Sequence, residues 1–208
     1  MRQATVTRKT RETDIALTLN LDGQGRAEVD TGIGFFNHML ILFAAQSRVD
    51  LAVRCQGDLE VDCHHTVEDV GIALGQALAQ ALGDKAGITR YGDAWVPMDE
   101  ALVQAVLDIS GRPWLTFRGE FSADRVGGFD TQMTEEFFRA LAVHGGLTLH
   151  LRLVEGRNDH HRIEAAFKAF GRALRQAAAI DPVSYTHLDV YKRQHDPPGA
   201  RHLCPGGR

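Results

Sequence analysis

The sequence predicts an α+β fold made of two related halves. Stretches with apolar residues at alternate positions, typical of strands, interleave with stretches whose apolar residues follow the helical period. The order of helix, strand, turn and helix occurs twice along the chain. With 208 residues, the chain has the length of one domain or of two small halves that share a core.

The first half begins with strand patterns on both sides of a short helical stretch. Residues 4–32 alternate and are interrupted by DGQG at 22–25, which predicts a β-hairpin around that turn. Residues 34–47 are apolar at helical spacing and predict a buried helix. Residues 49–63 predict two strands on either side of QGD.

The second half repeats this order. Residues 95–121 have strand-like patterning with a turn at SGRP, 110–113. Residues 134–146 predict a helix that Thr134 caps and whose first turn is acidic. Residues 147–159 predict a strand and a turn.

One long amphipathic helix closes each half. The first spans 64–83, with Gly83 near its C-terminal cap, and the second spans 160–179. The first helix carries an apolar stripe at Val67, Val70, Leu74 and Leu78. Each helix therefore has one face for a shared core.

The two halves align with each other. Placing His38 on Glu136 brings Leu51 onto Leu149, each inside a predicted strand, and a gap of two residues then superimposes the two His-His-x-x-Glu stretches. Two copies are too few for a stacked solenoid, so the alignment predicts a pseudo-twofold duplication. We expect half-repeats at 1–92 and 93–182, followed by an atypical, disordered or non-native tail at 183–208, which lacks periodicity.

Composition narrows the class of protein. A net charge of −4 gives no reason to expect nucleic acid or an anionic membrane as a partner. No apolar run is long enough to span a bilayer, and the N-terminus lacks the apolar core of a secretory signal. Three cysteines without a C-x-x-C pair argue against a disulfide framework, and we expect a cytoplasmic location.

The paired histidines point to metal binding. His64 and Glu68 are four residues apart and share a helix face, whereas His65 lies about 100° round the helix and faces another neighbour. The second helix repeats this with His160, Glu164 and His161. Mixed nitrogen and oxygen donors favour Mn²⁺ or Fe²⁺, although Zn²⁺ or Co²⁺ fit the same donors. A single such pair would more often be surface or capping chemistry; its repetition favours metal.

Several stretches together resemble one family, imidazoleglycerol-phosphate dehydratase. They occur in order over about residues 5–182: TRET, DTGIGFFNHML, HHTVEDVGIALGQAL, ITRYG, PMDEAL, DISGRP, EEFFRALA with LTLHLR, and GRNDHHRIEAAFKAFGRALRQA. The resemblance implies removal of water from D-erythro-imidazole-glycerol phosphate to give imidazole-acetol phosphate in L-histidine biosynthesis. The enzyme would be a hydro-lyase.

The resemblance also implies an architecture and a cofactor. Each half-domain would hold a mixed sheet and two helices, packed as a sandwich of the kind found in domain 2 of ribosomal protein S5. We expect a homo-oligomer of 24 subunits built from trimers, with active sites at subunit contacts. Each active site would bind two Mn²⁺ ions and no organic cofactor, and the partner would be a small phosphate substrate.

Carried over position by position, the resemblance implies a site. The metal ligands would be His38, His64, His65, Glu68, Glu136, His160, His161 and Glu164. Glu12 and Glu164 are the candidates to move a proton, and Glu12 also matches a substrate contact. The remaining substrate contacts would be Arg90, Arg112, Lys168 and Asp99.

Alternatives remain open at several positions. Glu12 could be a solvated hairpin residue, and Asp99 with Glu100 could orient ligands, touch substrate hydroxyls or end a strand. Glu136 stands where many members of the family have histidine. The tail lacks the family's Ser-Thr-Lys-Gly stretch, which reaches the phosphate. A metal-storage assembly and a di-metal hydrolase are the competing functions.

Overall fold

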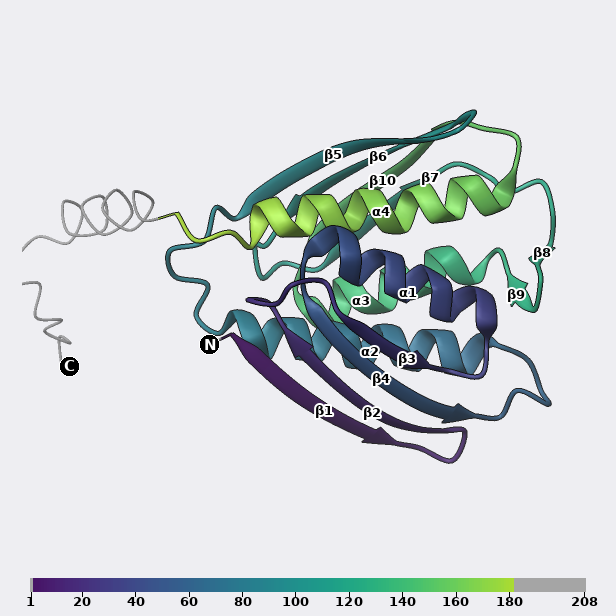
Figure 1. The fold of residues 1–208 in the computed structure, drawn as a ribbon, viewed down its shortest axis with the longest axis horizontal. Coiled ribbons are helices and arrows are strands. Elements are labelled where there is room, and N and C mark those ends of the chain that lie inside the picture. Colours follow the sequence, from purple (N-terminus) through teal and green to yellow (C-terminus); the bar gives the residue numbers. More distant parts are fainter. Residues whose placement is uncertain (1, 182–208) are drawn as a thin grey trace, which may run out of the picture.

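Two four-stranded sheets enclose four helices (Figure 1). The structure is a computed structural model that describes residues 2–181, so the predicted tail lies outside the described residues. The elements in chain order are β1 (Gln3–Lys9), β2 (Thr13–Asn20), β3 (Ala27–Asp30), α1 (Gly34–Ser47), β4 (Asp50–Gly57), α2 (His64–Leu82), β5 (Tyr91–Met98), β6 (Ala101–Asp108), β7 (Trp114–Arg118), β8 (Arg125–Val126), β9 (Phe129–Asp130), α3 (Met133–Gly145), β10 (Thr148–Glu155) and α4 (Asp159–Ala177).

The two sheets have the same topology, which confirms the predicted α+β fold with related halves. The first sheet has the order β1-β2-β4-β3 and the second has the order β5-β6-β10-β7. In both sheets the last strand runs parallel to its neighbour and the other pairs are antiparallel. Leu51 pairs with Leu19 in the first sheet, and Leu149 pairs with Leu107 at the same place in the second.

The predicted hairpin around 22–25 is wrong. The strands that flank this turn, β2 and β3, do not pair with each other, because β4 lies between them. The hairpin is instead β1 with β2, joined by residues 10–12. The Asp50 carboxylate at the start of β4 accepts from the backbone N–H groups of Gln24 (2.8 Å) and Arg26 (3.0 Å), so the turn wraps around an incoming strand. Local turn chemistry does not reveal such a crossover.

Two smaller predictions also fail. Residues 49–63 contain one strand, β4, and the chain then turns through 58–63 into α2, leaving Val61 65% exposed. Thr134 does not cap α3: the helix begins one residue earlier and the Thr134 side chain is fully buried. The predicted helix at 34–47 is confirmed, and Gly83 caps α2 as expected.

The helices join the two halves. Helix α1 packs on α4, and α2 packs on α3, so each pair crosses from one half to the other. Gly75 on α2 and Gly171 on α4 permit these approaches: a Cβ at Gly75 would lie 2.7 Å from the Leu141 carbonyl, and one at Gly171 would lie 3.0 Å from the Phe43 carbonyl. These two glycines occupy equivalent positions of the two His-His helices.

Phenylalanine rings fill the space between the helices. Phe167 on α4 is fully buried, and its ring centroid lies 4.9 Å from that of Phe138 and 5.1 Å from that of Phe137, both on α3. The ring of Phe36 on α1 completes the group, with its centroid 6.5 Å from that of Phe167. Among the described residues, no helix has both the length and the apolar composition needed to cross a bilayer.

Truncating this ring cluster should be costly. Phe167→Ala should lower the free energy of unfolding by about 3–5 kcal/mol, because it removes buried ring surface and leaves a cavity. Urea unfolding at one fixed protein concentration measures the loss. Ile41→Ala, at a 41% exposed position of α1, is the control and should cost far less. Equal losses would contradict a core centred on Phe167.

Candidate active site

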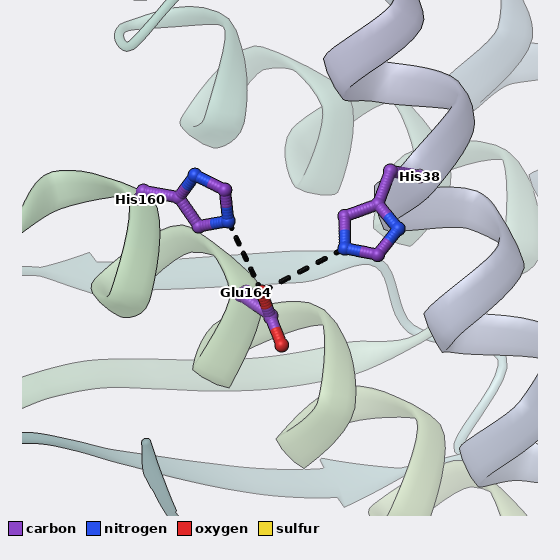
Figure 2. A group of neighbouring side chains, drawn as sticks. All are labelled: His38, His160 and Glu164. Atoms are coloured by element: carbon purple, nitrogen blue, oxygen red, sulfur yellow. Dashed lines mark hydrogen bonds and ion pairs between the residues drawn. The ribbon is translucent and has the colours of Figure 1, made fainter. Parts of the chain in front are cut away.

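Three predicted ligands from two helices meet at one carboxylate. His160 and Glu164 lie on the first two turns of α4, and His38 reaches them from α1 (Figure 2). The Glu164 carboxylate oxygen Oε2 lies 3.2 Å from His160 Nε2 and 3.8 Å from His38 Nε2. The three donor atoms lie within 4.8 Å of one another.

Local sequence explains how α4 presents these groups. The side chain of Asn158 caps the helix by accepting from the backbone N–H of His160 at 2.9 Å, which fixes where the first turn begins. The spacing of four residues then puts His160 and Glu164 on one face, as the sequence predicted. The ring of Phe35 packs edge-on against His160, with the centroids 5.0 Å apart.

The donor set fits a divalent cation. Glu164 is only 5% exposed, and its other oxygen, Oε1, lies 2.5 Å from Lys168 Nζ. Burial acts to raise the pKa of Glu164, but Lys168, His160 and His38 outweigh it, so this pKa lies below its usual value. The carboxylate is therefore ionised, as a metal ligand must be, and two imidazole nitrogens point at it.

The other helix pair, α2 with α3, builds only part of the same arrangement. His64 Nε2 lies 3.5 Å from Glu68 Oε2, which repeats the pair of α4. Glu136, the residue that the alignment places opposite His38, instead lies 3.4 Å from Arg139 one turn along α3. Within residues 2–181, a cluster of three donors forms only where α1 of the first half meets α4 of the second.

The second histidine of each pair binds a carboxylate outside its helix. His65 Nδ1 lies 2.9 Å from Asp58 Oδ2, and His161 Nδ1 lies 2.7 Å from Glu100 Oε2. These hydrogen bonds raise the pKa of both histidines. Sequence reasoning missed Asp58, because nothing in the loop 58–63 marks one acid as facing the helix.

Two carboxylates on the β5–β6 turn flank His161. Glu100 Oε1 accepts from the backbone N–H of Arg157 (3.0 Å) and of Asn158 (2.8 Å). The hydrogen bond from His161 contributes most, and together with these two backbone hydrogen bonds it lowers the pKa of Glu100 to about 2. Asp99 is 74% exposed at its side chain and lies 3.7 Å from His161 Nε2.

Glu12 lies on the β1–β2 turn with an exposed side chain. Its backbone carbonyl accepts from the N–H of Asp58 at 3.1 Å, so the turn sits beside the partner of His65. Below it, the buried Asp69 accepts from Thr13 Oγ1 (2.5 Å) and Arg8 Nη2 (2.8 Å). Asp69 thus fastens the turn to α2, a role that no sequence pattern indicated.

The two predicted phosphate arginines meet at a shared acid. Arg90 donates to both Asp108 oxygens, at 2.8 and 3.2 Å, and Arg112 Nη2 lies 3.7 Å from Asp108 Oδ2. Asp108 was not predicted; its place at the end of β6, opposite the start of β5, brings the arginines together.

These arginines do not approach the metal group of the same chain. The backbone N–H of Arg90 donates to the carbonyl of Ala177, at the last turn of α4, whereas His160 is on its first turn. At 1.5 Å per residue, these two ends of α4 are about 25 Å apart. Lys168, the third predicted cation, lies at Glu164 instead.

Comparisons with known proteins agree on one family. The family model described as imidazoleglycerol-phosphate dehydratase matches residues 31–174. Curated relatives with that name are 60% identical over 182 residues in Heliobacterium modesticaldum (88% of this chain, 93% of the relative) and 62% identical over 177 residues in Symbiobacterium thermophilum (85% of each).

Solved structures give the same result. The imidazoleglycerol-phosphate dehydratase of Staphylococcus aureus N315 has 43% identity and a TM-score of 0.78, covering 86% of this chain and 99% of its own. The structure from Pyrococcus furiosus, in complex with (S)-C348, has 36% identity and a TM-score of 0.76, covering 88% and 98%.

Metal affinity should depend on Glu164. Loss of a residue that only hydrogen-bonds to a metal ligand weakens metal binding by about 10–100-fold. Glu164→Gln should weaken Mn²⁺ binding by more than this, because it removes an anionic donor. Calorimetric titration of chelator-treated protein measures this. His144→Ala, at the far end of α3, is the control; a Glu164→Gln affinity equal to that of the control would exclude this carboxylate as a ligand.

Proposed function

The chain belongs to the imidazoleglycerol-phosphate dehydratase family, and from that premise we propose how its side chains divide the work. The reaction removes water from D-erythro-imidazole-glycerol phosphate and gives imidazole-acetol phosphate, a step of histidine biosynthesis, so the chain is a hydro-lyase. The substrate thus has a flat ring with two nitrogens at one end and a phosphate at the other.

We propose that each active site binds two Mn²⁺ ions. The family depends on a metal, and His38, His160 and Glu164 supply mixed nitrogen and oxygen donors of the kind that Mn²⁺ accepts. We assign the remaining ligand positions to His64, His65, Glu68, Glu136 and His161. When bound, the ions would hold the ring by its two nitrogens and offset the charge that changes as water leaves.

We assign proton transfer to Glu12 ahead of Glu164. Both oxygens of Glu164 already face cations or imidazoles, whereas the Glu12 side chain is exposed and, within residues 2–181, has no hydrogen-bond or ion-pair partner. A free carboxylate on a fastened turn can take the proton from the substrate carbon beside the ring. We assign Asp99, which is exposed and lies 3.7 Å from His161 Nε2, to a substrate hydroxyl.

The position of the arginines supports an oligomeric active site. The backbone of Arg90 is bonded to the last turn of α4, about 25 Å along that helix from His160, and Arg112 lies with Arg90 at Asp108. This separation is longer than one imidazole ring with a glycerol phosphate chain. We propose that these arginines bind the phosphate of a substrate whose ring is held by the metal group of another subunit. Lys168 of that other subunit, next to its Glu164, would contact the same phosphate. A cytoplasmic 24-subunit assembly built from trimers would provide such contacts.

Dehydration should depend on added metal. Chelator-treated protein should not release imidazole-acetol phosphate, and Mn²⁺ should restore release more fully than Zn²⁺ or Co²⁺ because the donors are mixed and partly carboxylate. Product formation measured beside a size determination tests both the ion and the assembly. Full activity in a monomer would contradict the shared site, and equal recovery with all three ions would contradict the choice of Mn²⁺.

Two inactive variants should restore each other. Arg90→Ala and His160→Ala, each alone, should lose nearly all activity, since one removes a phosphate contact and the other a ligand. Co-expressed in one oligomer, they should regain about a quarter of the sites, because random mixing pairs an intact arginine end with an intact metal end. Product release per subunit measures the recovery, and its absence would place both ends of the site in a single chain.

A further inference from the structure

The duplication places a glutamate at the same point of each half. Leu19 pairs with Leu51, and Leu107 pairs with Leu149, so these leucines mark equivalent places in the two sheets. Glu12 and Glu100 each stand seven residues before their leucine, at the turn that precedes β2 or β6. By position, both glutamates should face the His-His helix of their own half.

The two glutamates have different roles. Glu100 is fully engaged: one oxygen accepts from His161 Nδ1 and the other accepts from the backbone at the entry of α4. Among the described residues, the Glu12 side chain has no such contact, because Asp58 occupies the corresponding position at His65. Asp58 comes from the loop after β4, a part of the fold that contributes no histidine partner in the second half.

We propose that Asp58 and Glu100 are positioning residues that hold the His65 and His161 rings by Nδ1, and that Asp58 thereby frees Glu12 for catalysis. This rests on the proposed function, in which both histidines are ligands. A neutral ring that donates from Nδ1 to a carboxylate keeps the lone pair on Nε2 for a cation. The carboxylate therefore selects which nitrogen binds and fixes the ring plane.

The surroundings of Asp58 suit this role. Its Oδ1 atom is buried and has no hydrogen-bond partner within residues 2–181, and its Oδ2 atom bonds to His65. Its backbone N–H donates to the Glu12 carbonyl at 3.1 Å, which ties the ring holder to the turn that carries the catalytic candidate. One residue thus sets the spacing between His65 and Glu12.

Metal titration separates the two glutamates. Chelator-treated full-length protein is titrated with Mn²⁺ alone, and free Mn²⁺ is followed by its electron paramagnetic resonance signal. Asp58→Asn and Glu100→Gln should each weaken Mn²⁺ binding by about 10–100-fold. Asp58→Ala should weaken it further, because the amide oxygen in Asp58→Asn can still accept from His65 Nδ1 whereas alanine has no acceptor. Glu12→Gln should leave Mn²⁺ affinity unchanged while dehydration is lost.

Glu60→Gln, an exposed acid in the same loop as Asp58, is the matched control for lost charge and should bind Mn²⁺ as the parent chain does. Thermal unfolding of the metal-free variants tests whether they fold. If the melting temperature of Asp58→Asn is lowered, the Mn²⁺ affinities of Glu100→Gln and Glu12→Gln are compared instead. A parent chain that binds no Mn²⁺ would defeat the ligand set itself. If the parent chain binds Mn²⁺ normally, two results would overturn only this inference. One is that the Asp58 and Glu100 variants bind Mn²⁺ as tightly as Glu60→Gln does. The other is that Glu12→Gln binds Mn²⁺ as weakly as Glu100→Gln does.

Discussion

The close contact of helices across the two halves determines the geometry of this protein. Gly75 and Gly171 let α3 and α1 lie almost backbone to backbone against α2 and α4. All four helices begin at the same end of the molecule in Figure 1, so this packing carries their first turns toward one another. His38 can reach the buried Glu164 only because α1 lies this close to α4. A core of phenylalanine rings behind the contact keeps the spacing fixed.

The sequence revealed those parts of the site that depend on local spacing, and it missed those that depend on tertiary partners. The i, i+4 pairs of His160 with Glu164 and of His64 with Glu68 follow from the helix alone. The partners of Asp58, Asp69 and Asp108 include His65, Arg8 and Arg90, which are 7, 61 and 18 residues away, and nothing near the three acids in the sequence indicates these pairs. The misplaced hairpin has the same cause, since β4 lies between its predicted members, antiparallel to β2 and parallel to β3.

Duplication supplied two similar frames, and the chain used them unequally. We propose that 1–92 and 93–182 descend from one unit, although β5 already begins at Tyr91. The contact of α1 with α4 assembles a three-donor group within the described chain, whereas at the contact of α2 with α3 Glu136 lies toward Arg139. Likewise, one turn glutamate is held by three hydrogen bonds and its counterpart faces solvent. Symmetric backbones thus carry an asymmetric distribution of chemistry.

The paired glycines also leave a signature that could be read without any structure. A Cβ at position 75 would lie 2.7 Å from the main chain of the facing helix and one at position 171 would lie 3.0 Å from it, and a main-chain obstacle cannot rotate away. A library of all single substitutions should therefore show two matching gaps in tolerance, one per half, at sites where glycine is otherwise a poor helix former. Two such intolerant positions, at equivalent places in the two halves, would be evidence of the ancestral duplication from fitness data. This evidence would not depend on sequence similarity between the halves.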